Sequence, residues 1–172
     1  DDTAVKLRSE DGRFIKDIDI SLFINDLPNK KDTHCFSTLD ASGSTSQAAG
    51  IVESIEAGSR LFLLDEDTSA TNFMVRDAFM QRVILREKEP ITPFLERARD
   101  LYEKAGISTV LVAGSSGAFF HIADTIIQMD NYVPRDITET AKALCSQYPL
   151  AEISVPEFTM PHSSRIMTKA VS

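Results

Sequence analysis

The chain has 172 residues, of which 42% are hydrophobic and 26% charged, values of an ordinary globular protein with one sizeable core. Its 26 acidic residues outnumber 18 basic ones, and the net charge of −8 argues against a broad nucleic-acid or membrane surface. The two cysteines, Cys35 and Cys145, match no metal-binding spacing and indicate reduced thiols of an intracellular protein.

The N-terminal part of the sequence predicts β-structure. Residues 5–7 and 13–20 flank the turn-forming sequence Ser-Glu-Asp-Gly, so we expect an N-terminal β-hairpin. A polar loop over residues 27–32 and a short extended segment over 36–39 follow it.

A helix and a strand with an acidic end are predicted next. Small residues over 42–46 open a helix that covers about 47–57, and Gly58 ends this helix as a C-terminal glycine does. Residues 61–64 form a short apolar run typical of a buried strand, and the run stops abruptly at Asp65-Glu66.

Two further helices are expected in the middle of the chain. One begins after Asn72 and places Phe79 and Val83 four residues apart on its inner face. The next begins at Thr92-Pro93, with Pro at the first helical position, and ends at Gly106. Its predicted apolar stripe consists of Phe94, Ala98, Leu101, Tyr102 and Ala105.

A second strand and a glycine–serine loop follow the third helix. Residues 109–113 are predicted to form another buried strand, which ends at the loop Gly114-Ser115-Ser116-Gly117. Beyond this loop we expect a short helix over 119–124, a strand over 126–129 and a turn over 130–134.

The C-terminal region ends the regular pattern. Asp136 and Glu139 form a predicted capping box for a last helix that reaches about residue 147. Beyond Pro149 the periodicity fades, so we expect one domain over 1–148 and a C-terminal extension or connection over 149–172. The alternation of strands and helices predicts an α/β fold with a mostly parallel sheet flanked by helices.

The acidic strand end is the first of three segments that could carry chemistry. In an open α/β sheet, ligands bind just outside the carboxyl ends of the strands, where Asp65 and Glu66 are expected. Such a pair can hold a hydrated Mg²⁺ and orient an attacking water. A strand that ends in a solvated acidic turn is an equally good interpretation of this segment alone.

The other two segments are rich in small residues. Residues 42–46 could form an anion site, because the N–H groups and the dipole of a helix start favour negative charge. An ordinary Ser/Thr N-cap is the simpler interpretation of that motif by itself. The loop over 114–117 could lie beside the same ligand, but it lacks the Gly-x-Ser-x-Gly pattern and an evident partner histidine of a serine hydrolase.

Taken in order, these segments resemble the second half of an ABC-type nucleotide-binding domain, a P-loop NTPase. Residues 41–45, Ala-Ser-Gly-Ser-Thr, stand where that family has its Leu-Ser-Gly-Gly-Gln signature. Residues 65–72 are similar to the Walker B end and D-loop, and residues 112–130 are similar to the switch segment. The segments over 41–49, 65–74 and 88–94 resemble the soluble family called predicted ATPases of the ABC class, over roughly residues 5–143.

The resemblance implies ATP and Mg²⁺ as ligands and a second copy of the domain as partner, paired head to tail in a homodimer. It implies that Asp65 holds Mg²⁺ through water and that Glu66 polarises the attacking water. The implied contacts to the γ-phosphate of the partner's ATP come from the signature residues Ser42, Gly43, Ser44 and Thr45. The implied D-loop residues are Ser69 and Asn72, and the implied residues of the switch loop are Gly114 and Ser115.

Several positions depart from the family pattern. The second glycine of the signature is Ser44, its glutamine is Thr45, and the closing aspartate of the D-loop is Asn72. The switch histidine is replaced by Gly114, so the contact it makes with the γ-phosphate must come from elsewhere, with the next two serines as candidates. These departures leave the rate of hydrolysis open.

The phosphate-binding loop is missing from this sequence. No Gly-x-x-x-x-Gly-Lys-Ser/Thr motif occurs in the 172 residues, and the family places that motif upstream of the signature. The sequence also begins at Asp1 and not at a methionine. We therefore expect a fragment that holds half of each composite site, is inactive alone, and has the missing N-terminal half of the protein as a partner.

Three functions are compatible with these features. The main hypothesis is ATP binding and hydrolysis by a soluble ABC-class ATPase. The alternatives are an ATP-gated scaffold for nucleic acid or protein partners with little hydrolysis, and a degenerate domain that binds no nucleotide. Because the sequence holds no apolar run of membrane-spanning length and no signal peptide, we expect a soluble intracellular protein of the cytoplasm or an organelle matrix.

Overall fold

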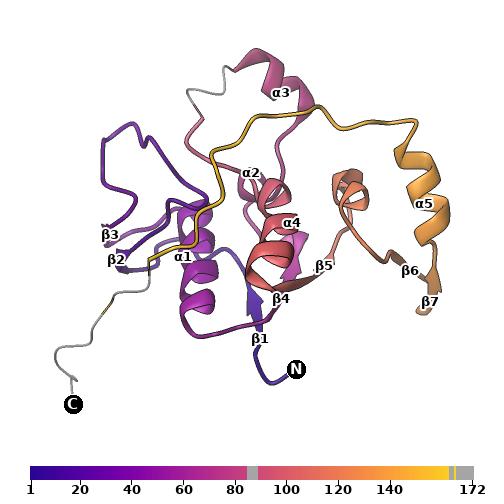
Figure 1. The fold of residues 1–172 in the computed structure, drawn as a ribbon, viewed down its shortest axis with the longest axis horizontal. Helices are drawn as coiled ribbons and strands as arrows, with labels where there is room; N and C mark the ends of the chain where they lie inside the picture. The colour runs from indigo at the N-terminus through magenta and orange to yellow at the C-terminus, as the bar shows by residue number, and fades with distance from the viewer. Residues whose placement is uncertain (85–88, 163–164, 166–172) are drawn as a thin grey trace.

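The computed structural model describes residues 1–84, 89–162 and 165, and a parallel sheet lies at its centre (Figure 1). The sheet has the strand order β1-β4-β5, and both neighbouring pairs are parallel. Its carboxyl ends therefore lie at one edge. Together with the flanking helices, this sheet confirms the predicted α/β class. The three strands are β1 (Ala4–Leu7), β4 (Leu61–Asp65) and β5 (Ser108–Val112).

The antiparallel pair near the N-terminus is built from other strands than predicted. β2 (Ile15–Ile18) pairs with β3 (Phe36–Thr38), which lies within the expected extended segment. Residues 5–7, the expected first arm of the hairpin, belong to β1 and pair in parallel with β4. The pairing of 5–7 with 13–20 is therefore wrong, because a short alternating segment specifies a buried face but not its partner strand.

Helix α1 (Gly43–Glu56) begins earlier than predicted and packs beside β1 and β2. Ser42 has extended backbone angles, and its Oγ accepts a hydrogen bond from the N–H of Thr45, so the helix starts directly after this cap. Gly58 adopts the left-handed conformation (φ 81°) just beyond the helix, as the sequence predicts.

Helix α4 (Phe94–Ala105) follows its predicted boundaries and packs against β5. Pro93 is the N-cap and not the first helical residue, and Gly106 ends the helix with a φ of 67°. Phe94 of this helix stacks on Phe23, with ring centroids 6.4 Å apart. Of the predicted stripe, Phe94 and Leu101 are buried and Ala98 and Ala105 pack partly against the core, but Tyr102 is 52% exposed.

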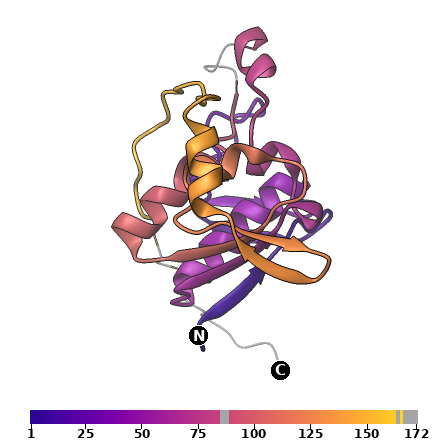
Figure 2. The ribbon, with the colours of Figure 1, turned by 90° about the vertical axis from the view of Figure 1, so that its right-hand side faces the viewer.

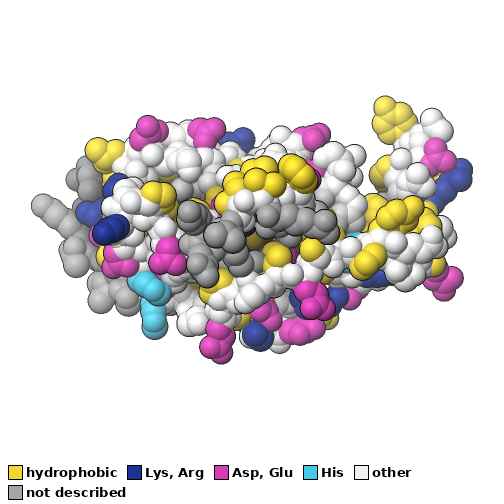
Figure 3. Space-filling model, turned by 90° about the horizontal axis from the view of Figure 1, so that it is seen from above, with side chains coloured by type: hydrophobic (Ala, Val, Ile, Leu, Met, Phe, Trp, Pro, Cys, Tyr) yellow, Lys and Arg dark blue, Asp and Glu magenta, His cyan; other side chains and the backbone are white. Residues whose placement is uncertain are grey.

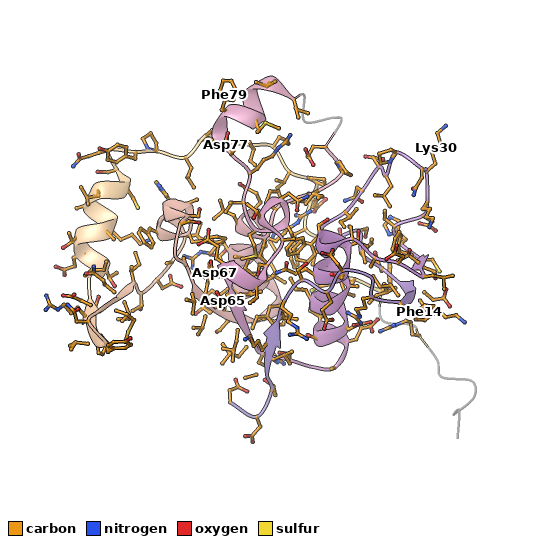
Figure 4. All side chains as sticks on the ribbon, turned by 180° about the vertical axis from the view of Figure 1, so that it is seen from behind. Phe14, Lys30, Asp65, Asp67, Asp77 and Phe79 are labelled. Carbon is orange, nitrogen blue, oxygen red and sulfur yellow. The ribbon has the colours of Figure 1, made fainter. Side chains whose placement is uncertain are left out.

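Two predictions of buried surface are wrong. The second helix divides into α2 (Thr71–Met74) and α3 (Ala78–Val83), and Phe79 and Val83 of α3 are exposed. Figure 4 shows Phe79 standing apart from the core, and Figure 3 shows hydrophobic side chains on the face where α3 lies. Val110 and Val112, which share one face of β5, are also exposed, and β5 is an edge strand of the sheet among the described residues.

A short helix, a two-stranded ribbon and the last helix lie to one side of the main sheet (Figure 2). The strands of the ribbon pair antiparallel. The predicted capping box is wrong, because Ile137 is the N-cap and Asp136 instead accepts hydrogen bonds from the N–H and Oγ1 of Thr138. The elements are η3 (Gly117–His121), β6 (Ile127–Asp130), β7 (Val133–Asp136) and α5 (Thr138–Cys145).

The segment after Pro149 crosses back over the fold without helix or strand as far as residue 162. The buried guanidinium of Arg97 donates from Nη1 to the carbonyl of Pro156 at 2.8 Å. Residues 163–164 and 166–172 of the expected extension, and residue 88 of the motif over 88–94, lie outside the described residues.

Candidate functional site

The carboxyl ends of β4 and β5 place two of the predicted segments next to each other. Asp65 at the end of β4 is in register with Val112 at the end of β5. Glu66 and the loop over 114–117 therefore leave the sheet at the same edge. Figure 4 shows Asp65 and Asp67 together near the centre of the molecule at this edge.

The loop after β5 surrounds the carboxylate of Glu66. Oε2 accepts hydrogen bonds from the backbone N–H groups of Gly114 at 2.8 Å, Ser115 at 2.9 Å and Ser116 at 3.4 Å. Oε1 accepts one from the Oγ of Ser115 at 2.8 Å. The N–H of Ser115 contributes most to lowering the pKa of Glu66 below its usual value. The loop is therefore an anion-binding nest, and Glu66 is the anion it holds.

Asp65 is oriented by the turn that follows it. Its Oδ1 accepts a hydrogen bond from the N–H of Asp67 at 3.1 Å and so caps the short helix η1 (Glu66–Thr68). Its main-chain carbonyl accepts from the Oγ of Ser69 at 2.8 Å. The two acids of the pair thus have different partners, since Asp65 binds its own turn and Glu66 binds the neighbouring loop.

The carboxylate of Asp65 could hold a magnesium ion only if a nucleotide and water supplied the other ligands. Among the described residues, no group of three His, Cys, Asp or Glu side chains could hold a metal. A cation beside Asp65 would therefore take most of its ligands from water and phosphate oxygens. Mg²⁺ accepts this arrangement, because it commonly binds through one or two carboxylates and keeps several waters.

The start of α1 is closely packed. Ser42 is exposed, Thr45 is half-buried and Ser44 is buried, so Ser42 is the most accessible hydroxyl of the predicted signature. A Cβ at Gly43 would overlap the Oγ of Ser9, so a larger residue here would require the Ser9 side chain to turn away. The helix dipole makes this end favourable for an anion.

A buried glutamine joins α1 to the segment after the acidic pair. Gln47 is fully buried; its Nε2 donates to the Oγ of Ser69 at 2.9 Å, and its Oε1 accepts from the N–H of Ala70 at 2.9 Å. Asn72, the other predicted D-loop residue, is exposed on α2. The structure therefore brings Ser69 to α1, whereas Asn72 faces solvent.

Comparison with models of protein families matches residues 1–165 to the P-loop domain of ABC_ATPase. The chain belongs to this family. The match supports a nucleotide-binding function of the ATPase type and confirms the family that the motifs of the sequence resemble. A comparison of this chain with curated protein sequences found no match. Within the part of the chain that the structure describes, no helix has the length and apolarity to cross a membrane.

Sequence reasoning overlooked two contributors to the site of this ABC_ATPase domain. The first is Gln47, and the one signal for it in the sequence is a polar amide directly before the apolar residues Ala48 and Ala49, which are buried. The contact between Ser9 and Gly43 had no such signal, because it depends on the loop after β1 reaching the start of α1.

Proposed function

We propose that the intact protein binds and hydrolyses ATP as a head-to-tail homodimer. By intact protein we mean this chain together with the segment that carries its phosphate-binding loop. The contact between Glu66 and residues 114–116 supports this function best, because it joins an acid and an anion-binding loop at the ligand-binding edge of a parallel sheet. Family membership supports the nucleotide.

In the proposed reaction, Glu66 orients and polarises the water that attacks the γ-phosphate in line. The water oxygen bonds to the γ-phosphorus while the bond from that phosphorus to the β–γ bridging oxygen breaks, so ADP and inorganic phosphate form and the protons of the water remain on the released phosphate. Once released from the loop, Glu66 has the ordinary pKa of a glutamate, so its carboxylate stays ionised at neutral pH and can accept a hydrogen bond from the water. Mg²⁺, when bound beside Asp65, neutralises charge on the phosphates.

The loop over 114–116 would exchange one anion for another during this reaction. Its N–H groups and the Oγ of Ser115 bind Glu66 in the structure. The same donors suit a γ-phosphate, and they would replace the switch histidine whose position Gly114 occupies. Release of Glu66 to the water and capture of the phosphate by Gly114 and Ser115 would then occur together.

The second copy would complete each site with the start of its α1. Exposure of Ser42 and the dipole of this 14-residue helix support contact with the γ-phosphate of the partner's ATP. In this arrangement Ser42, Gly43, Ser44 and Thr45 face the opposite nucleotide, while Ser69 and Asn72 lie between the two sites.

The phosphate-binding loop would come from a segment that these 172 residues do not contain. Among the described residues, no strand pairs with the outer edge of β5, where Val110 and Val112 are exposed. A further parallel strand along this edge would end beside the loop over 114–117. A phosphate-binding loop at the end of that strand would face Glu66.

A scaffold that closes on ATP with little hydrolysis is the second candidate. Gly114 favours this candidate, because it offers no side chain in place of the switch histidine. The Glu66 carboxylate also favours it, because both of its oxygens accept hydrogen bonds from its own chain. Nucleic acid or protein would be its partner. Normal ATP-dependent dimers with negligible single-turnover hydrolysis would favour this scaffold over the ATPase.

Glu66→Gln in the intact protein tests the proposal. We expect turnover to fall by more than about 100-fold, because an amide orients and polarises water poorly, while ATP binding and dimer formation survive. Glu139→Gln is the control, since Glu139 is exposed on α5 and should leave turnover unchanged. Wild-type turnover in Glu66→Gln would contradict the role of Glu66, and a wild-type protein that binds no ATP would indicate a degenerate domain.

A further inference from the structure

Among the described residues, the hydrogen bonds of the Gln47 side chain all go to the turn and helix that follow the acidic pair. Its amide donates to the Oγ of Ser69, accepts from the N–H of Ala70 and approaches the sulfur of Met74 at 3.5 Å. The side chain is 0% exposed. A buried amide is stable only when its donor and acceptor both have partners, and both partners here belong to the same short segment.

These contacts continue to the acidic pair itself. Ser69, which accepts from Gln47, donates its own hydroxyl proton to the carbonyl of Asp65 at 2.8 Å. A continuous path of two hydrogen bonds thus connects the first turns of α1 with the backbone of Asp65. Asp65 and Glu66 are adjacent, so a shift of this backbone would also move the carboxylate of Glu66.

The opposite end of the path is also fixed. Ser46, next to Gln47, donates to the carbonyl of Gly43 at 2.7 Å and accepts from the N–H of Glu10 at 2.8 Å. A Cβ placed on Gly43 would lie 3.6 Å from the Cβ of Ala70, so the two segments are in direct contact there. A shift of the first turn of α1 alone would therefore break the hydrogen bond between Glu10 and Ser46.

We propose that Gln47 is a positioning residue that couples the two sites of the dimer. When the start of α1 binds the γ-phosphate of the partner's ATP, Gln47 transmits its position through Ser69 to Asp65 and Glu66 of its own copy. One site thereby reports its occupancy to the catalytic carboxylates of the other. This inference rests on the proposed head-to-tail ATPase and adds the residue that links its two sites.

The test is a double-mutant cycle in the intact protein, with Gln47→Met and Ser69→Ala. Methionine keeps the length and packing of Gln47 but makes neither hydrogen bond. We expect kcat to fall by about 10- to 100-fold with the KM for ATP within about threefold, because misplaced carboxylates slow the chemical step without removing the nucleotide site. The Hill coefficient for ATP should fall toward 1.

The combined variant should lose little more activity than the more impaired single variant, because both substitutions interrupt the same path. Ser54→Ala is the matched control: Ser54 is a buried polar residue of α1 whose Oγ donates to the carbonyl of Gly50 within the helix. It should lower the melting temperature by no more than Gln47→Met does, with kcat and the Hill coefficient unchanged.

The results separate this inference from the proposed function. Wild-type protein without ATP turnover would contradict the ATPase itself. Normal turnover in Gln47→Met, additive losses in the cycle, or an equal loss of kcat in Ser54→Ala would each contradict coupling through Gln47 while leaving the ATPase in place.

Discussion

The two glycine-containing loops at the candidate site are held in different ways. At the start of α1, a side chain on Gly43 would overlap Ser9 and lie 3.1 Å from the Oδ1 of Asp11, whereas a Cβ on Gly114 would meet no heavy atom within 4 Å. The first loop is fixed by packing and by the buried amide of Gln47. The second is held on Glu66 by hydrogen bonds near the surface.

This difference indicates different tasks for two anion-binding loops. A tightly packed loop can recognise a phosphate without reorganising, which is the property that electrostatic preorganisation requires. A loop held by a single carboxylate can change its partner when a stronger anion arrives. The first loop is therefore suited to the proposed contact with the partner's ATP, and the second to the proposed exchange of Glu66 for phosphate.

The largest difference between the loops is expected from a matched pair of alanine substitutions. Gly43→Ala should destabilise the protein by about 1 kcal/mol, because the side chains of Ser9 and Asp11 must turn away to make room. Gly114→Ala should change stability by less than about 0.5 kcal/mol, because its surroundings are open and its φ lies outside the left-handed region. The measurement is the midpoint of urea unfolding, and equal shifts would contradict the comparison.

A smaller effect is expected from Ser115→Ala. This change removes the hydroxyl that donates to Oε1 of Glu66 and leaves the backbone donors in place. Loss of this one exposed hydrogen bond should cost at most about 1 kcal/mol of loop stability. Faster amide hydrogen exchange at residues 114–116, with the exchange of Gln47 and Ala70 unchanged, would support the comparison. Unchanged exchange throughout the loop would contradict it.

The smallest effect is a shift in an acid titration. Because the pKa of Glu66 is lower in the folded protein than in the unfolded one, the contact stabilises the protein at neutral pH and is lost as pH falls through the folded value. The amide NMR signals of Gly114 and Ser115 should titrate with a midpoint below about 4.3, the ordinary value for glutamate. A midpoint above that value would show that the loop does not hold the ionised carboxylate.

The sequence could predict the site in those places where local rules apply. The end of β4 at the acidic pair and the loop after β5 were predictable, because a strand that stops at polar residues is a local pattern and parallel neighbours share an edge. The cap at Ser42 and the glycines that end α1 and α4 are local in the same way.

The parts that the sequence could not predict depend on long-range placement. The pairing of β1 with β4 joins residues more than fifty positions apart. The exposure of Phe79 and Val83 depends on α3 standing away from the core, although their four-residue spacing is typical of a buried helix face. The contacts of Gln47 depend on the turn after β4 reaching α1, which no spacing in the sequence shows.

The central claim is that each ATP site combines the acidic pair of one copy with the signature of the other, and mixing two inactive variants tests it most directly. Glu66→Gln disables the first half. Ser42→Asp disables the second, because aspartate preserves the helix cap but repels the γ-phosphate. Each variant alone should be inactive.

When the two variants are mixed as nucleotide-free monomers in equal amounts, half of the dimers should be mixed, and each mixed dimer has one intact site of two. The account predicts that turnover returns when ATP is added, to at most about one quarter of the wild-type value, because the disabled site cannot help to position the carboxylates of the intact one. A mixture that stays as inactive as its components would contradict it, because sites completed within a single copy cannot be restored by a partner.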